Sequence, residues 1–254
     1  MEKPTRLYKY ESGSTHSLTN LSDSKIWFSD PRTFNDPFDC ALPVDMPELT
    51  DADCVATLDA LANRFGESDV ARFRGHSAAD LKTRIARGLR TALEDGLRTV
   101  GGVSCFSEKV DDILMWGHYA NGHRGFCLEF ETALDDTFEL ARPVRYTDRF
   151  PTVDIAEVIQ FRFGSVFDLM CTKATCWAYE KEWRVLHKEM GTLFGYRPCS
   201  LIGVYFGAVM PDAEQRKIGN VLLNTETKLY KMSMAPNEFR LLATPAAFTA
   251  VGPP

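Results

Sequence analysis

The residues best suited to chemistry lie in one short segment that is rich in aromatic and acidic side chains. Glu180 and Glu182 stand one residue apart, and Trp177, Tyr179 and Trp183 flank them. On a β-strand, residues i and i+2 point to the same face, so both carboxylates are expected to face one side of a sheet. Carboxylates beside apolar surface can have shifted pKa values and can stabilise a developing positive charge. The segment therefore predicts a catalytic centre, with Glu182 and Glu180 as its catalytic residues. The alternative is an amphipathic strand entry with salt bridges to Lys181 or Arg184.

A second cluster carries groups that can hold a nucleotide. His118, Tyr119, His123 and Arg124 lie close together in the chain, around the end of a predicted helix. Imidazole and phenol groups can bind a ribose and a base, and a guanidinium suits a phosphate. A structural role is the alternative for each histidine, because a lone histidine is more often part of the packing than a ligand.

Two further clusters lie near the start of the chain. In residues 8–10, Lys9 or Tyr10 could bond a ribose or a carboxamide; the alternative is a solvated lysine between half-buried tyrosines. In residues 34–39, Asn35 and two aspartates could coordinate a cation or bond a ligand hydroxyl. The alternative is a rigid turn with side-chain-to-backbone bonds, pinned to the core by its two phenylalanines.

Composition and charge restrict the class of protein. Hydrophobic residues make up 44% of the chain and charged residues 25%, which is ordinary for a globular protein. The formal net charge of −6 argues against non-specific binding to nucleic-acid backbones, although a local basic groove stays open. No leader precedes the first strand and no apolar run reaches membrane-spanning length, so we expect a cytoplasmic protein with no membrane partner.

The cysteines and the missing motifs exclude several kinds of site. Seven cysteines lack a Cys-x-x-Cys pair and fit reduced thiols, and no Cys/His cluster has zinc-ligand spacing, so no metal is expected. The chain also lacks a phosphate-binding Gly-rich loop with Lys-Ser/Thr, a Gly-x-Ser-x-Gly motif and a His-Glu-x-x-His motif. These absences disfavour kinases, α/β-hydrolases and zinc proteases.

The order of predicted elements indicates an α+β fold. Apolar residues at helical spacing predict helices within residues 50–100 and over residues 112–119, 154–170 and 211–222. Alternating or apolar runs predict strands at residues 7–10, 25–29, 100–107, 125–131, 182–187, 201–208, 229–234 and 239–242. Without regular β-α-β alternation, we expect a mostly antiparallel (split) sheet with flanking helices. Residues 1–254 are predicted to form a single domain with a helical insertion at 50–100.

The clusters together resemble an uncharacterised family of bacterial and prophage proteins that is known only as a domain of unknown function. The resemblance rests on five motifs in this order. They are Leu-Tyr-Lys-Tyr at 7–10, Phe-Asn-Asp-Pro-Phe-Asp at 34–39, Cys-Phe-Ser at 105–107, Met-Trp-x-His-Tyr-Ala-x-x-His-x-Gly at 115–125 and Lys-x-x-x-Trp-x-Tyr-Glu-x-Glu-Trp-Arg at 173–184. The motifs are specific as a set, and residues 50–100 fall in the variable part.

A weaker resemblance points to a reaction. Glu180-x-Glu182 is similar to the Glu-x-Glu of ADP-ribosyltransferases, which implies NAD as the substrate. The resemblance implies that Glu182 bonds the nicotinamide ribose and stabilises the cation formed as nicotinamide leaves, while Glu180 positions the acceptor. It would give Lys9 or Tyr10 the nicotinamide side, and Ser29 or Tyr119 the role of a later-strand hydroxyl; Lys9 departs from the usual Arg or His.

The remaining NAD contacts expected here are Asn35, His118, Arg124 and Trp177, with Trp177, Tyr179 and Trp183 as aromatic walls. The acceptor would be a protein or a nucleic acid. The activity would suit a toxin or phage-defence effector, and toxicity would favour an antitoxin partner. This interpretation predicts that Glu182→Gln loses most turnover while the protein still folds.

Two other functions remain open at this level. One is a non-catalytic module whose aromatic pocket binds a nucleotide or a peptide. The other is a metal-assisted hydrolase or nuclease built on His118, His123, Asp36, Asp39 and Glu182. NAD turnover, chelator sensitivity and binding without turnover would distinguish the three.

Overall fold

The computed structural model describes residues 2–41, 48–73, 75–151 and 164–246. These residues fall into two compact units, which are treated separately below. The sheet unit comprises Met1–Asp30, Gly102–Val144 and Thr175–Pro254, and the helical unit comprises Pro31–Gly101 and Arg145–Ala174. The expectation that residues 1–254 form a single domain stays a prediction.

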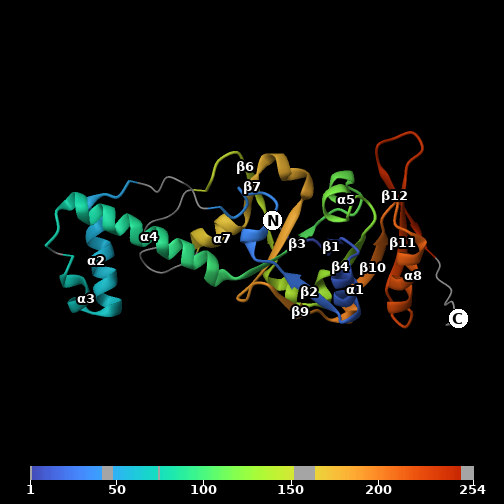
Figure 1. Cartoon of the computed structure of the whole chain (residues 1–254), viewed down its shortest axis with the longest axis horizontal. Helices are drawn as coiled ribbons and strands as arrows, with labels where there is room; N and C mark the ends of the chain where they lie inside the picture. The colour runs from blue at the N-terminus through green and yellow to red at the C-terminus, as the bar shows by residue number, and fades with distance from the viewer. Residues whose placement is uncertain (1, 42–47, 74, 152–163, 247–254) are drawn as a thin grey trace. The chain divides into compact units, whose positions relative to one another are not determined.

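An eight-stranded sheet organises the sheet unit (Figure 1). Its strand order is β12-β11-β10-β4-β1-β3-β8-β5, and only β10 and β11 run parallel to each other. The predicted α+β class with a mostly antiparallel sheet is therefore confirmed. The bounds are β1 Arg6–Glu11, β3 Gly102–Ser107, β4 Phe126–Glu131, β5 Arg142–Pro143, β8 Glu182–His187, β10 Leu201–Phe206, β11 Lys228–Met234 and β12 Leu241–Pro245.

The register of this sheet sets four polar residues in one row. Glu129 lies opposite Tyr8, Tyr8 lies opposite Ser107, and Ser107 lies opposite Glu182. Side chains of directly opposed residues project to the same face of a sheet. These four side chains therefore share one face, which we call the site face.

The other face, the core face, carries the alternating apolar residues of the same strands. Leu7, Phe106, Leu128 and Trp183 are buried there in the main hydrophobic cluster. Helices α1 (Thr15–Ser22) and α8 (Asp212–Val221) and the antiparallel pair β2 (Lys25–Phe28) and β9 (Thr192–Gly195) add apolar residues to that cluster. The period-2 pattern of the strands thus places the main hydrophobic cluster on one face and the row of four polar residues on the other, where Trp116, Cys127 and Tyr205 belong to a second hydrophobic cluster.

Helix α5 (Ile113–Tyr119) packs on the site face near β1. The Asp112 carboxylate caps it by accepting from the N–H groups of Leu114 (2.9 Å) and Met115 (3.1 Å). Trp116 is buried against Tyr10, with ring centroids 5.3 Å apart. The helix ends before Asn121, which adopts a positive φ of 49°. This packing sets the position of the residues at the end of α5.

The helical unit contains the predicted helices of residues 50–100. They are α2 (Asp51–Phe65), α3 (Glu67–Ala71) and α4 (Ala78–Val100), and α4 also packs on α7 (Gly164–Met170). A capping box starts α2, because the Thr50 hydroxyl accepts from Asp53 N–H and the Asp53 carboxylate accepts from Thr50 N–H. The parallel strands β6 (Arg145–Thr147) and β7 (Thr172–Ala174) complete the unit. Of the helix predicted at 154–170, residues 154–163 lie outside the described residues.

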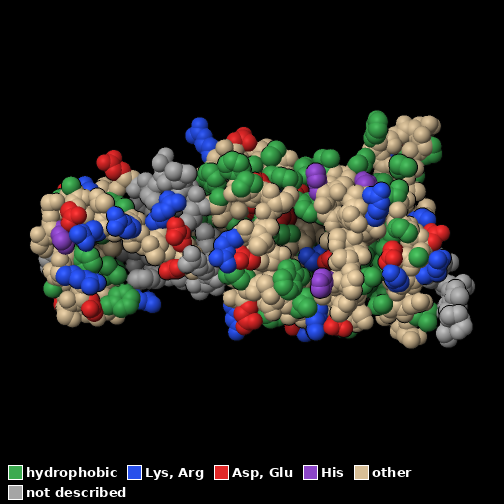
Figure 2. All heavy atoms as spheres, in the orientation of Figure 1, with side chains coloured by type: hydrophobic (Ala, Val, Ile, Leu, Met, Phe, Trp, Pro, Cys, Tyr) green, Lys and Arg blue, Asp and Glu red, His purple; other side chains and the backbone are tan. Residues whose placement is uncertain are grey.

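The surface carries charges of both signs. Figure 2 shows acidic and basic side chains interspersed on the visible face, in keeping with the modest net charge. Within the part of the chain that the structure describes, no helix combines the length and the apolar character needed to cross a membrane.

Candidate functional site

The two glutamates do not share a strand, which corrects the sequence-based expectation. Glu180 ends a 3-10 helix that spans Thr175–Glu180, and β8 begins only at Glu182. Between them, Lys181 adopts a left-handed backbone conformation with φ of 46°. Such a residue reverses the local chain direction, so the i, i+2 rule for strands does not apply here. The two carboxylates reach their positions through different backbone geometries.

Glu182 lies at the start of β8 and is held by an arginine from the same strand. Arg184 donates from Nε to Glu182 Oε1 (2.7 Å) and from Nη2 to Glu182 Oε2 (3.1 Å). Both residues are buried, with 4% of Glu182 and 0% of Arg184 exposed. A bidentate pair of this kind fixes the orientation of both planar groups. Glu182 is therefore a rigidly held, buried carboxylate and does not lie in bulk solvent.

Cys105 lies beside this ion pair, directly opposite Arg184 across β3 and β8. Burial and the nearby Glu182 carboxylate hold the pKa of the Cys105 thiol well above its ordinary value. A thiol with such a pKa stays protonated at neutral pH and is a poor nucleophile. Cys105 therefore supplies a neutral wall to the site.

Glu180 is held by two other motif residues. The Tyr119 hydroxyl, at the end of α5, donates to Glu180 Oε1 over 2.6 Å. The Ser107 hydroxyl donates to the Glu180 backbone oxygen, also over 2.6 Å. Because Ser107 lies opposite Glu182 in the sheet, it connects the two glutamates. Glu180 is 2% exposed, so the site holds two buried carboxylates with different partners.

Three rings gather next to Glu180. His118 lies with its ring centroid 6.1 Å from that of Trp177 and 6.5 Å from that of Tyr179, and the last two are 6.0 Å apart. His118 is exposed, and the other two are half-buried. We call these residues the aromatic cluster. Such rings offer flat apolar surface on which a planar group can stack.

Trp183 does not belong to this wall, contrary to expectation. It is buried in the cluster on the core face, and its indole N–H donates to the Glu108 carboxylate over 2.7 Å. Trp183 and Glu182 are adjacent on β8, so their side chains point to opposite faces. The sequence pattern located the aromatic residues correctly but not the face that each one joins.

The residues expected on the nicotinamide side are not brought to Glu182. Lys9 lies opposite Leu128 on the core face, where its ammonium donates to Ser104 Oγ over 3.0 Å. Tyr10 is on the site face, but its hydroxyl donates to the backbone oxygen of Lys109 over 2.8 Å. Lys9 and Glu182 are thus separated by the sheet itself.

Ser29 contributes its backbone to the sheet. Its N–H and C=O groups both pair with Val103, each over 2.9 Å, which makes an isolated bridge to β3. Val103 is two residues along β3 from Cys105. Ser29 therefore extends the sheet beyond the ion pair rather than joining the glutamates.

Asn35 belongs to the helical unit and is exposed. In the same loop, the Asp36 carboxylate accepts from the backbone N–H of Phe38 over 2.9 Å, which is the bond of a local turn. Asp39 is buried and pairs with Lys173 at 3.5 Å. The loop motif and the lysine of the last motif therefore meet inside the helical unit.

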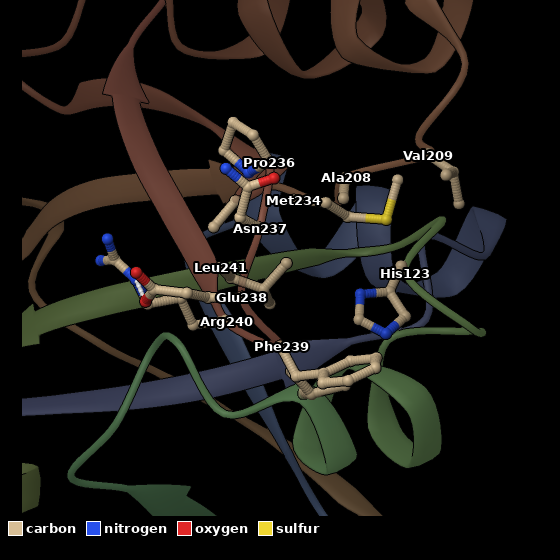
Figure 3. A pocket seen from close by; sticks show the side chains of 12 residues that line it. His123, Ala208, Val209, Met234, Pro236, Asn237, Glu238, Phe239, Arg240 and Leu241 are labelled. Atoms are coloured by element: carbon tan, nitrogen blue, oxygen red, sulfur yellow. Dashed lines mark hydrogen bonds and ion pairs between the residues drawn. The ribbon is translucent and has the colours of Figure 1, made fainter.

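His123 and Arg124 make their described contacts with residues other than the two glutamates. The His123 ring stacks on Trp116 with centroids 6.4 Å apart, and burial lowers its pKa. Figure 3 shows His123 between Met234 and Phe239 in a pocket at the β11–β12 hairpin. Arg124 is exposed, and its guanidinium reaches the backbone oxygen of Gly122 over 3.5 Å.

The residues proposed for the metal-assisted alternative are divided between the two units. Asp36 and Asp39 are engaged within the helical unit, whereas His118, His123 and Glu182 belong to the sheet unit. Across the described ranges, no three His, Cys, Asp or Glu side chains converge in a way that could hold a metal ion.

A second buried glutamate on the site face was missed by sequence reasoning. Glu129 accepts from Arg6 (2.8 Å), Tyr8 (3.2 Å) and Tyr205 (2.9 Å). A Cβ atom on Gly203 would come within 2.5 Å of the Glu129 carboxylate, so glycine makes room for it. Burial and the Glu129 charge raise the pKa of Tyr8 to about 12. The available signal was a glutamate at an otherwise apolar position of a predicted strand.

Ser107 was missing from the predicted site, and Arg184 was expected only in the alternative interpretation, as a salt-bridge partner of the glutamates. Their sequence signals were the spacing Glu182-x-Arg184, which places opposite charges on one strand face, and the serine at the end of a buried strand. Neither signal indicates that Arg184 binds a buried Glu182 or that Ser107 binds Glu180. The structure shows that both residues hold the glutamates.

The comparisons with known proteins concern the family alone. A family model described as a protein of unknown function, DUF2971, matches residues 115–185. The match supports an uncharacterised family, and it spans Tyr119, Glu180, Glu182 and Arg184. No curated protein and no solved structure gave a significant match.

Proposed function

We propose that the sheet unit carries an NAD-using active site that transfers ADP-ribose to a protein or nucleic-acid acceptor. The observation that supports it is the presence of two buried carboxylates, Glu180 and Glu182, one residue apart in the chain and beside an accessible aromatic cluster. Buried carboxylates are costly unless they are paired and hydrogen-bonded. Both are hydrogen-bonded here, which offsets that cost, and it is their position next to stacking rings that we take as support for chemistry.

Fixed carboxylates suit the proposed transition state. Cleavage of the bond between ribose and nicotinamide builds one positive charge around C1 of the ribose. Fixed charges in a site that excludes water act without reorganising and are worth several kcal/mol, of the order of 3 kcal/mol for one group.

The roles follow from the partners of each residue. Glu182, oriented by Arg184, stabilises the cation, and Glu180, oriented by Tyr119, accepts the proton of the incoming acceptor. The rings of Trp177 and Tyr179 pack against the nicotinamide ring and exclude water. Such an enzyme would suit a toxin or phage-defence effector.

The test is the release of nicotinamide from NAD by the full chain, with and without candidate acceptors. Glu180→Gln and Trp177→Ala are expected to lower kcat/KM by about 100-fold or more, since each removes a group that acts on the reacting ring or its acceptor. Glu189→Gln is the matched control, because Glu189 is an exposed glutamate just beyond β8. Folding of each variant is checked by circular dichroism.

Parent protein that releases no nicotinamide and transfers no label from NAD to any acceptor would refute the proposal. So would Glu180→Gln and Trp177→Ala variants that turn over as fast as the Glu189→Gln control.

One observation favours a second candidate, a nucleotide-binding module without turnover. Both carboxylate oxygens of Glu182 already accept from Arg184, as in a pair whose task is to hold the sheet. In that case the aromatic cluster binds NAD, and Trp177→Ala weakens binding although no product forms. Saturable binding without nicotinamide release would decide for this module.

A further inference from the structure

A pocket at the β11–β12 hairpin of the sheet unit takes no part in the proposed NAD reaction (Figure 3). Its volume of about 450 Å³ lies within the ~300–1,000 Å³ of pockets that enclose small molecules. The start of α5, the turn after α5, the segment after β10 and the hairpin itself contribute to its walls. The lining includes Ile113, His123, Val209, Met234, Phe239 and Leu241.

Two apolar side chains of the hairpin are left uncovered at this pocket. Met234 is 73% exposed and Phe239 is fully exposed. Phe38 is also exposed, and does not pin its loop to the core as the sequence predicted, but it packs against Phe150 with ring centroids 6.5 Å apart. Phe239, in contrast, contacts no aromatic ring among the described residues. Uncovered apolar groups that border a pocket form a candidate binding surface.

His123 places an imidazole in this apolar pocket. Figure 3 shows the ring between the Met234 thioether and the Phe239 ring. Burial lowers the pKa of His123, so at neutral pH the imidazole is uncharged and offers one N–H donor and one nitrogen acceptor. In the part of the chain that the structure describes, neither ring nitrogen has a hydrogen-bond partner. A ligand can therefore bond to His123 without displacing a protein group.

The backbone of His123 is held in an uncommon conformation. Its φ of 63° lies in the left-handed region, which residues other than glycine seldom adopt. Its N–H donates to the Trp116 oxygen and its oxygen accepts from Val209 N–H, each over 3.1 Å. A Cβ on Gly207 would come within 2.2 Å of the His123 oxygen, so glycine permits this close approach. The imidazole is thus positioned by its surroundings before a ligand arrives, which lowers the cost of binding.

The charges of the lining offset each other. Glu238 and Arg240 are the lining residues with charged side chains, and they form an ion pair in which both are exposed. The apolar walls offer no compensation for a charge that leaves water. The lining therefore suits an uncharged ligand.

We propose that this pocket binds an uncharged aromatic molecule that carries a hydroxyl group. Its ring packs on the apolar lining that includes Met234 and Phe239, because thioether and phenyl groups pack favourably on aromatic rings. Its hydroxyl bonds to His123. A hydroxyl both donates and accepts, so it matches either imidazole nitrogen, whichever carries the proton. The proposal is independent of the NAD reaction.

The test is equilibrium dialysis of the full chain against 2-naphthol, whose own fluorescence reports its concentration. Saturable binding is expected at millimolar concentration or below. Naphthalene-2-sulfonate has the same rings and a fixed charge, and should bind at least about 10-fold more weakly. Equal binding of the two compounds would overturn the assignment of an uncharged ligand.

The hydroxyl contact is tested by changing His123 and the ligand together. His123→Phe keeps a ring but removes both nitrogens, and should weaken binding of 2-naphthol by about 2- to 10-fold, the range for one hydrogen bond. Binding of naphthalene, which has no hydroxyl, should stay within about twofold. Any effect of the variant on the fold acts on both compounds alike, so equal losses would overturn the contact.

Truncation of the hairpin side chains tests the place of binding. Met234→Ala and Phe239→Ala should each weaken 2-naphthol binding by about 3- to 30-fold, whereas Phe239→Leu should stay within about threefold of the parent. Leu140→Ala is the matched control, because Leu140 is 68% exposed in the same unit and does not line the pocket. Trp177→Ala should also leave binding unchanged, which excludes the aromatic cluster as the place of binding.

The proposal is overturned if 2-naphthol does not bind saturably to the parent protein. It is equally overturned if Met234→Ala and Phe239→Ala bind as well as Leu140→Ala, or if Trp177→Ala abolishes binding. A second copy of the chain is the other possible occupant of an exposed apolar hairpin. Sedimentation of the parent as a dimer that Phe239→Ala converts to a monomer would assign the hairpin to an interface and overturn the proposal.

Discussion

The buried pair of Glu182 and Arg184 makes the sharpest prediction about stability. The two side chains share two hydrogen bonds of 2.7 and 3.1 Å and are almost completely removed from solvent. Removing one member of such a pair deprives the other buried charge of this partner, which typically costs about 3–5 kcal/mol. Whole domains are stable by about 5–15 kcal/mol, so the loss is a large part of the total.

Sequence reasoning alone predicted that Glu182→Gln would fold normally, and the buried partner changes that expectation. Glutamine keeps the shape and can accept one N–H from Arg184, so we expect a loss near the lower end, about 3 kcal/mol. Arg184→Met leaves a buried carboxylate and should cost at least as much. The double variant removes both charges and should be more stable than the sum of the two single losses predicts.

The measurement is urea-induced unfolding of the four proteins, followed by circular dichroism, with Glu189→Gln as an exposed control expected within about 0.5 kcal/mol of the parent. A coupling energy of about 2 kcal/mol or more between Glu182 and Arg184 supports the buried pair. A Glu182→Gln variant as stable as the control, with additive effects in the double variant, would refute the reasoning. Turnover of Glu182 variants must then be compared per folded molecule.

Three further outcomes follow from the same face of the sheet. Tyr119→Phe removes the donor to buried Glu180 and should cost about 1–3 kcal/mol in urea unfolding, whereas an unchanged midpoint would mean that this hydrogen bond is not made in solution. Gly203→Ala places a Cβ against the Glu129 carboxylate and should cost about 1–3 kcal/mol with a lowered Tm, so an unaffected Tm would contradict the close approach. Cys105 should resist alkylation by iodoacetamide up to about pH 9 while exposed cysteines react, as mass spectrometry of labelled peptides would show, because burial and Glu182 raise its pKa. A thiol with a raised pKa in the folded state binds its proton more tightly there, so its contribution to stability is complete below the pKa of the unfolded chain and declines as the pH rises above it.

The sequence by itself determined the class of fold and most of its elements. Alternating or apolar runs predicted β4, β8, β11 and β12, and apolar residues at helical spacing predicted α5, which Asp112 caps. These features are local: a period of two or 3.6 residues, a cap and a turn are written in neighbouring positions. The Glu-x-Glu segment and its aromatic neighbours were likewise found from residue types alone.

Only the tertiary structure decided which of those residues meet. The left-handed Lys181 separates Glu180 from the strand, and the register of β3 with β8 places Ser107 and Cys105 against the glutamates. Strand alternation also sends Lys9 and Trp183 to the core face, away from Glu182. The register of paired strands, and the sheet face that each side chain takes, depend on contacts between residues distant in the chain. A shift of one residue moves every side chain of the strand to the other face. The residue types suited to chemistry could be identified from the sequence, whereas the folded sheet decided which of them lie close together.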